Sequence, residues 1–329
     1  MKLISNITSS RVLIQTHDFP DPDAIASAFG LQSLLETYNI EATICYKGKI
    51  DRHNTRKMME LFNIKAVNID RIVSMPEDTQ LILIDAQKNS GNVFDLSCDK
   101  VISIDHHQVV QGYPYVFADV RTNVGACASI IASYFFENNI PITVEVATAL
   151  LYGIKIDTAQ LTRGVSQLDL DVFSKMFFMV DEKYMDALES GTVELEDLQA
   201  YGSAISSITV EDYVSFANTG KDCPEALIAE IADFMVAVKD VYLAVVYSVR
   251  TEGIKISVRS DKQSGCNAGK IVIDALEGIG TGGGHARMAG GYISLRNRIE
   301  SLETLLEIVR ENFKRVVAEH LDKLKEVAV

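Results

Sequence analysis

Short apolar runs rich in β-branched residues alternate with helical patterns through the first half of the chain. The runs are RVLIQTH (11–17), EATICY (41–46), LILIDA (81–86) and KVISIDHH (100–107). Continuous apolar strands that alternate with helices are typical of βαβ units and of a parallel sheet covered on both faces. Three of the four runs carry Asp or His at their ends. Because the carboxyl ends of parallel strands meet at one edge of a sheet, we expect these side chains to gather there.

The second half of the chain starts with a purely helical pattern and then returns to strands. Residues 168–207 have helical spacing, and EDYVSFA at 211–217 begins a new series of strands and helices. The sequence therefore predicts an α/β fold made of two α/β domains. We expect a larger N-terminal domain (1–190) with a mainly parallel sheet, a helical linker (191–210), and a smaller C-terminal domain (211–329) with a mixed sheet.

The chain is acidic, with 45 Asp and Glu against 31 Lys and Arg and a net charge of −14. Residues 1–220 hold 29 acidic and 16 basic residues, so most of the imbalance lies there. Proteins that track long nucleic acids usually present a basic face to the phosphates. We therefore expect no long duplex partner, although a local basic patch can hide within these totals.

The cysteines, the N-terminus and the apolar runs indicate the cellular compartment of the protein. The five cysteines are scattered and form no C-x-x-C pair, which argues against a disulfide framework or a zinc ribbon. The N-terminus lacks the apolar core of a signal peptide, and no apolar run approaches the roughly 20 residues of a membrane span. We expect a cytoplasmic protein without a membrane partner, and a homodimer is left open.

The segment HDFPDPD, directly after the first strand and before the first long helix, holds three potential metal ligands in seven residues. They are His17, Asp21 and Asp23. Two prolines restrict the backbone between them. One acid would suffice to cap the following helix, so capping explains neither the histidine nor the second aspartate. This pattern favours a metal site.

Further acids and imidazoles follow the ends of later elements. Asp85 follows an apolar strand, Asp157 ends a helical pattern, and Asp105, His106 and His107 end another strand. Neighbouring side chains on an extended backbone point in opposite directions, so we expect one histidine to coordinate metal and the other to face a substrate phosphate. Carboxylates mixed with imidazoles, without thiolates, suit Mn²⁺ or Mg²⁺. Two such ions about 3.5–4 Å apart, bridged by one carboxylate, recur in phosphoester hydrolysis.

The C-terminal half offers candidates for phosphate binding. Glycines at 282–284 allow backbone N–H groups to approach an anion closely, and His285 can donate to a phosphate. The alternative is a tight turn before the next strand. Arg259, at a strand end, suits a bidentate phosphate contact. The substrate-binding candidates are Arg259, Gly283, Gly284 and His285.

Five motifs in this order resemble those of a known family. HDFPDPDAIAS, LILIDA, SIDHHQ and GIKIDT are similar to the four motifs of the DHH phosphoesterase superfamily, and TGGGHARMAGG (281–291) resembles the signature of its DHH-associated C-terminal domain. This pairing is typical of the NrnA and RecJ-like branch, which includes bifunctional oligoribonucleases and phosphatases of 3′-phosphoadenosine 5′-phosphate.

The resemblance implies roles for the motif residues. One metal would be held by His17, Asp21 and Asp85, and the other by Asp23, Asp85, His106 and Asp157. Asp85 would bridge the two ions. His107 would face the phosphate, and Asp105 would orient a ligand, so the catalytic set comprises Asp85, Asp105, His106 and His107.

The resemblance also implies a function. We expect a phosphoesterase with two divalent metal ions, Mn²⁺ first and Mg²⁺ as the alternative, that hydrolyses short oligonucleotides with a metal-activated hydroxide. A further candidate substrate is 3′-phosphoadenosine 5′-phosphate. The partners would be short oligonucleotides or small phosphorylated nucleotides. One alternative is a phosphodiesterase for dinucleotides such as pApA or cyclic di-AMP. Another is a RecJ-like single-strand exonuclease, which the net charge disfavours. A non-catalytic nucleotide-binding module would be expected to lack ligands, and none is missing.

Overall fold

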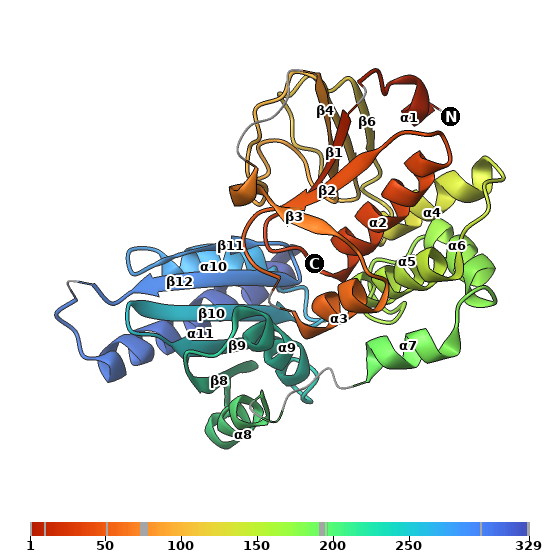
Figure 1. Ribbon diagram of the computed structural model, residues 1–329. Helices are drawn as coiled ribbons and strands as arrows, with labels where there is room; N and C mark the ends of the chain where they lie inside the picture. The colour runs from red at the N-terminus through yellow and green to blue at the C-terminus, as the bar shows by residue number, and fades with distance from the viewer. Residues whose placement is uncertain are drawn as a thin grey trace. The chain divides into compact units, whose positions relative to one another are not determined.

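The computed structural model describes residues 2–9, 11–50, 52–72, 78–190, 195, 197–296 and 298–327, with side chains up to 322. The chain forms two compact units, Met1–Thr192 and Val193–Val329. Each unit contains one six-stranded sheet with helices packed on it (Figure 1). The first sheet is parallel and the second is mixed, which confirms the predicted fold class.

The first sheet has the strand order β3-β2-β1-β4-β5-β6. Its strands are β1 (Arg11–Thr16), β2 (Ala42–Tyr46), β3 (Ala66–Asn68), β4 (Thr79–Ile84), β5 (Val101–Asp105) and β6 (Phe117–Val120). Every residue of the central strands β4 and β5 is buried, as their apolar runs predict. The edge strands β3 and β6 are not predicted by the sequence pattern, because three or four residues are too few to show a periodicity.

Helices cover one face of this sheet (Figure 1). The helices of the unit are α1 (Lys2–Ser5), α2 (Pro22–Glu36), α3 (His53–Leu61), α4 (Cys127–Glu137), α5 (Val144–Asp157), α6 (Gln167–Phe177) and α7 (Glu182–Glu189). The main core lies between α2, α4, α5 and the sheet. Loop residues such as Leu96 and Tyr113 cover the opposite face over Leu81 and Leu83. The sheet is therefore shielded on both sides, by helices on one and by loops on the other.

The second sheet has the order β11-β12-β10-β9-β8-β7. Its strands are β7 (Thr209–Glu211), β8 (Val214–Lys221), β9 (Leu243–Val249), β10 (Gly253–Ser260), β11 (Thr281–Gly284) and β12 (Met288–Ser294). Helices α8 (Asp197–Ser207) and α9 (Glu225–Met235) pack on one face, and α10 (Ala268–Leu276) and α11 (Leu302–Val327) on the other. The strand expected at 211–217 starts later, because Asp212 and Tyr213 turn the chain with φ of 49° and 67°.

Two expected connections can be followed in part in the structure. Of the expected helical linker at 191–210, residues 191–194 and 196 lie outside the described part of the chain. Within the rest, α8 buries Ala200 and Ala204 in the core of the second unit. The glycine run, expected as a loop or tight turn, forms edge strand β11, paired with β12. A Cβ on Gly282 would lie 2.2 Å from Val272 of α10, so glycine is required for this close packing.

In the described part of the chain, no helix is long and apolar enough to cross a membrane.

Candidate metal centre

The six predicted metal ligands come together at the carboxyl edge of the parallel sheet. His17 follows β1, Asp21 caps α2, Asp23 lies in its first turn, Asp85 follows β4, His106 follows β5 and Asp157 ends α5. Parallel pairing of β1, β4 and β5 places the three strand-end residues side by side. The topology therefore brings together residues that are up to 140 positions apart in the sequence.

The distances divide the cluster into two overlapping halves. His17 Nε2 lies 3.8 Å from Asp21 Oδ1 and 3.7 Å from Asp85 Oδ2. His106 Nε2 lies 3.3 Å from Asp85 Oδ1 and 3.2 Å from Asp157 Oδ2. In each of two triads, His17–Asp21–Asp85 and Asp23–His106–Asp157, the candidate ligand atoms lie within 4.8 Å of one another. Asp85 contacts both halves.

Asp85 has a geometry suited to a cation. Its φ of 56° lies in the left-handed region, where a non-glycine residue is uncommon, immediately after the buried strand β4. The Oδ1 atom of Asp85 and the Nε2 atom of His106 are both buried and have no aligned hydrogen-bond partner. Buried polar atoms without partners are costly, and those of a native site call for an ion or a water. These two atoms therefore fit a divalent cation.

Asp23 is held by the start of another helix. Its two carboxylate oxygens accept hydrogen bonds from the backbone N–H groups of Cys127 (2.7 Å) and Ala128 (2.9 Å), the first residues of α4. Burial and the neighbouring carboxylates of Asp85 and Asp157 raise the pKa of Asp23. The helix N-terminus thus orients a carboxylate that would otherwise be repelled by its neighbours.

The charges of the cluster depend on one another. Burial opposes a charge on His17, but Asp21 and Asp85 outweigh it and raise the pKa of His17 to about 10. Burial also opposes a charge on His106, whose pKa Asp85 and Asp157 raise to about 11. Burial raises the pKa of Asp157 to about 6. The carboxylates therefore require positive charge among them, which a divalent cation bound to the same atoms would supply.

Asp105 and His107 form a pair beside the cluster. The ring nitrogen His107 Nδ1 lies 2.8 Å from Asp105 Oδ1, and the hydrogen bond raises the pKa of His107. Asp105 also accepts the backbone N–H of His106 and the side-chain amide of Gln87 (2.7 Å). The His107 side chain is 40% exposed, so its ring can be reached by a substrate.

Sequence reasoning missed three residues around this site. The side-chain amide of Gln87 donates to Asp105 and to the carbonyl of Gln108, and its side-chain oxygen accepts the backbone N–H of Val110. The one sequence feature that could have indicated this role is its position two residues after Asp85. Phe19 is 61% exposed beside the ligand loop. Its ring lies so close to Gly48 that a Cβ there would be 2.7 Å from a ring carbon.

The substrate-binding candidates of the second unit lie near one end of its sheet. Arg259 of β10 is in register with Met288 of β12, at the start of the strand that follows His285. The Nε atom of Arg259 donates to Asp233 Oδ1 of α9 at 2.7 Å, so part of its guanidinium is already engaged. His285 is exposed in the turn between β11 and β12, and Gly283 and Gly284 belong to edge strand β11.

Family models match both units. Residues 11–154 match the DHH family N-terminal domain, and residues 209–315 match the DHHA1 domain. The chain belongs to the DHH family. The two matched segments contain four of the five motifs that the sequence analysis singled out; the fifth, GIKIDT (153–158), begins at the end of the first segment and places Asp157 just beyond it. The motif resemblance is therefore confirmed.

Several curated proteins are similar to this DHH chain. An uncharacterized protein of Methanocaldococcus jannaschii is 29% identical over 94% of this chain and 63% of its own length. The cyclic-di-AMP phosphodiesterase GdpP of Geobacillus thermodenitrificans is 23% identical over 93% of this chain and 48% of its own length. A probable manganese-dependent inorganic pyrophosphatase of Streptococcus thermophilus is 29% identical over 46% of this chain and 49% of its own length. The chain thus spans 48% to 63% of the length of these relatives, which is less than two thirds of each.

Among solved structures, an exopolyphosphatase-related protein from Bacteroides fragilis has a similar fold. The TM-score is 0.73 at 17% identity, and the match covers 97% of this chain and 96% of that one. At this identity the likeness concerns the fold alone.

Proposed function

We propose that this chain is a metal-dependent phosphodiesterase that releases nucleotides from short oligonucleotides, with two divalent cations at the metal centre. The observation that carries the proposal is a pair of buried atoms without an aligned hydrogen bond, Asp85 Oδ1 and His106 Nε2, at the middle of a cluster of four carboxylates and two imidazoles. A cluster of this kind without cations would be self-repelling. Its oxygen-rich ligands favour Mn²⁺ or Mg²⁺, and its imidazoles favour Mn²⁺.

Each residue has a proposed task in this reaction. His17, Asp21 and Asp85 hold one cation, and Asp23, Asp85, His106 and Asp157 hold the other. When bound, the cations lower the pKa of a water molecule and neutralise charge on the phosphoryl oxygens. The exposed ring of His107, oriented by Asp105, donates to a phosphate oxygen of the substrate.

In the second unit, four residues are proposed to contact the substrate. The Nε atom of Arg259 donates to Asp233 and its Nη1 atom to Ser257 and to the Val258 carbonyl, so Arg259 offers the substrate its Nη2 group; exposed His285 offers its ring. Gly283 and Gly284 lie on edge strand β11, where a Cβ on Gly283 would meet nothing within 4 Å. A nucleotide can therefore approach the backbone of Gly283 closely.

A cyclic dinucleotide is the second candidate substrate. The cyclic-di-AMP phosphodiesterase relative matches 93% of this chain, which includes both family domains. The pyrophosphatase relative matches 46% of the chain. The extent of these two matches supports a nucleotide diester over inorganic pyrophosphate as the substrate.

A length series tests the proposal. Release of mononucleotide in the presence of Mn²⁺ is measured for RNA and DNA from two to about 25 nucleotides, alongside cyclic di-AMP, 3′-phosphoadenosine 5′-phosphate and pyrophosphate. We expect the rate to fall steeply beyond about five nucleotides. A rate that is flat or rises with length would favour a RecJ-like exonuclease, and hydrolysis of pyrophosphate alone would overturn the proposal.

A further inference from the structure

The segment after β2 carries a concentration of basic residues that the negative net charge of the chain conceals. Seven of the 16 Lys and Arg of residues 1–192 fall between positions 47 and 71, where there are three Asp and Glu. The remainder of residues 1–192 holds nine basic and 21 acidic residues. A cationic stretch of 25 residues thus lies within an otherwise acidic unit. Such a concentration is the electrostatic footprint of an anionic ligand.

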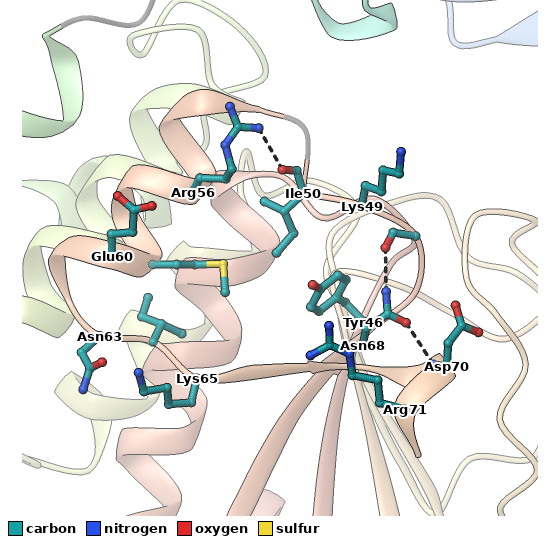
Figure 2. Close-up of a pocket in the computed structure, with 13 residues that line it drawn as sticks. Tyr46, Lys49, Ile50, Arg56, Glu60, Asn63, Lys65, Asn68, Asp70 and Arg71 are labelled. Carbon is teal, nitrogen blue, oxygen red and sulfur yellow. Dashed lines mark hydrogen bonds between the residues drawn. The ribbon is translucent and has the colours of Figure 1, made fainter. Parts of the chain in front are cut away.

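This stretch encloses a hollow of about 860 Å³ between α3 and β3, which we call the β3 pocket (Figure 2). Ligand pockets for small molecules usually measure about 300–1,000 Å³. Its apolar lining comes from Tyr46, Ile50, Met59 and Ile64. Figure 2 shows Tyr46 and Ile50 toward the middle of the hollow and charged side chains around them. An apolar centre with a charged rim suits a base and its phosphates.

The unpaired charge of the rim is mainly positive. Three exposed cations line it and have no ion pair in the described part of the chain; they are Lys49, Lys65 and Arg71. Of the two acids in the lining, Asp70 forms an ion pair with Lys47. Glu60 is the one acid of the described lining that is left without such a partner. The pocket therefore attracts anions.

The β3 pocket adjoins the metal centre. Gly48, which lines the pocket, packs against the ring of Phe19. The backbone N–H of Phe19 donates to the carbonyl of Lys47 at 2.9 Å. Phe19 lies in the loop between the predicted ligands His17 and Asp21. One residue contact thus separates the pocket from the ligand loop.

We propose that the β3 pocket binds the strand of an oligonucleotide substrate beyond the nucleotide held at the metal centre. The inference rests on the proposed phosphodiesterase function and extends it to the way in which the substrate's length is sensed. The ring of Tyr46 packs against a base, and the ammonium of Lys65 and the guanidinium of Arg71 neutralise phosphates of the strand. A dinucleotide is too short to use these contacts.

The test compares the double variant Lys65→Ala/Arg71→Ala with the wild type on a dinucleotide and a pentanucleotide. We expect kcat/KM for the pentanucleotide to fall about tenfold at low salt, while kcat/KM for the dinucleotide changes less than twofold. The slope of log affinity against log salt should fall by about 1.4, because each phosphate contact to a single strand contributes about 0.7. The matched control is Arg11→Ala/Lys183→Ala, which removes two exposed cations outside the pocket and should leave both substrates unaffected.

Binding without turnover separates this inference from the proposed function. Fluorescence anisotropy of a labelled pentanucleotide is measured in EDTA for the wild type and both double variants. If no diester is hydrolysed but Lys65→Ala/Arg71→Ala weakens binding, the proposed reaction is wrong, whereas binding of the strand by the β3 pocket is supported. Equal affinity and equal salt slope in the wild type and this variant would overturn the pocket. An equal loss on dinucleotide and pentanucleotide would overturn it too, because the two residues would then act on the metal centre.

Discussion

The Nε2 atom of His106 lies 3.3 Å from the Oδ1 atom of Asp85, and neither atom has an aligned hydrogen-bond partner although both are buried. His106 also approaches Asp157, and Asp85 also approaches His17. The two atoms therefore lie where the two halves of the cluster meet. A cation held by Asp23, Asp85, His106 and Asp157 would satisfy both atoms. The other oxygen of Asp85, Oδ2, lies 3.7 Å from His17 Nε2, so the same carboxylate would also reach the second proposed cation.

Replacing Asp85 by asparagine should remove metal from both halves of the cluster. Asn keeps the size of the side chain but loses the negative charge and the second anionic oxygen. We expect hydrolysis to fall by more than about 100-fold, since changes to groups that only support a metal ligand typically cost 10–100-fold. Metal content, hydrolysis rate and circular dichroism are measured, with the exposed Asp99→Asn as the charge-matched control. Two bound ions and a normal rate in Asp85→Asn would exclude a bridging role.

Replacing Gly153 by alanine should weaken the half of the cluster that contains Asp23. A Cβ at this position of α5 would lie 3.1 Å from Asp23 Oδ1 and 3.2 Å from Ala26 Cβ. We expect the metal concentration for half-maximal hydrolysis to rise about tenfold. The control is Gly202→Ala in α8, where a Cβ meets nothing within 4 Å. This substitution should stabilise the fold by about 1 kcal/mol, because alanine favours a helix more than glycine does. An unchanged metal dependence in Gly153→Ala would show that Asp23 tolerates the crowding.

The position of the candidate ligands could be predicted because each follows an element with a strong pattern. Strands β1, β4 and β5 are apolar runs, and parallel pairing fixes where their ends lie. Sequence alone could not show how Asp23 is held. Its partners Cys127 and Ala128 follow more than 100 positions later, and nothing in either segment indicates the other.

The short edge strands and the β3 pocket could not be predicted for a different reason. Strand β3 has three residues, all half-buried, and it exists because it pairs with β2 rather than because its sequence favours extension. The pocket depends on this strand, since Lys65 precedes it and Arg71 follows it. The glycines at 282–284 likewise form a strand because α10 packs against them.

The ion pair of Asp119 should make stability depend on pH. Asp119 accepts two hydrogen bonds of 2.8 Å from Arg121 and one of 2.7 Å from the Tyr134 hydroxyl. Burial opposes its charge, but these donors outweigh burial and lower the pKa of Asp119. Because the folded pKa lies below the unfolded one, the contribution is complete above about pH 4 and is lost as the pH falls through the folded pKa.

The variant Asp119→Asn isolates this contribution. At pH 7 and pH 5 we expect the free energy of unfolding to fall by about 1.5–3 kcal/mol, as for hydrogen bonds to a charged group. The difference between wild type and variant should shrink below pH 4, where Asp119 is protonated in the unfolded chain. Urea unfolding at pH 7, 5, 4 and 3 measures it. A difference that stays constant down to pH 3 would contradict a charge-based contribution.

Replacing Gly48 by alanine should disturb the ligand loop through Phe19. Gly48 has φ +84°, and a Cβ would lie 2.7 Å from the Phe19 ring, which must then move. Because Phe19 lies between His17 and Asp21, we expect hydrolysis to fall about tenfold, besides a loss of about 1–2 kcal/mol of stability from the left-handed backbone. Gly91→Ala is the matched control, since Gly91 has φ +82° but a Cβ there meets nothing within 4 Å. The control carries the same backbone strain without the ring contact. An equal loss of hydrolysis in both variants would therefore assign the effect to strain, whereas a loss confined to Gly48→Ala assigns it to the displaced ring.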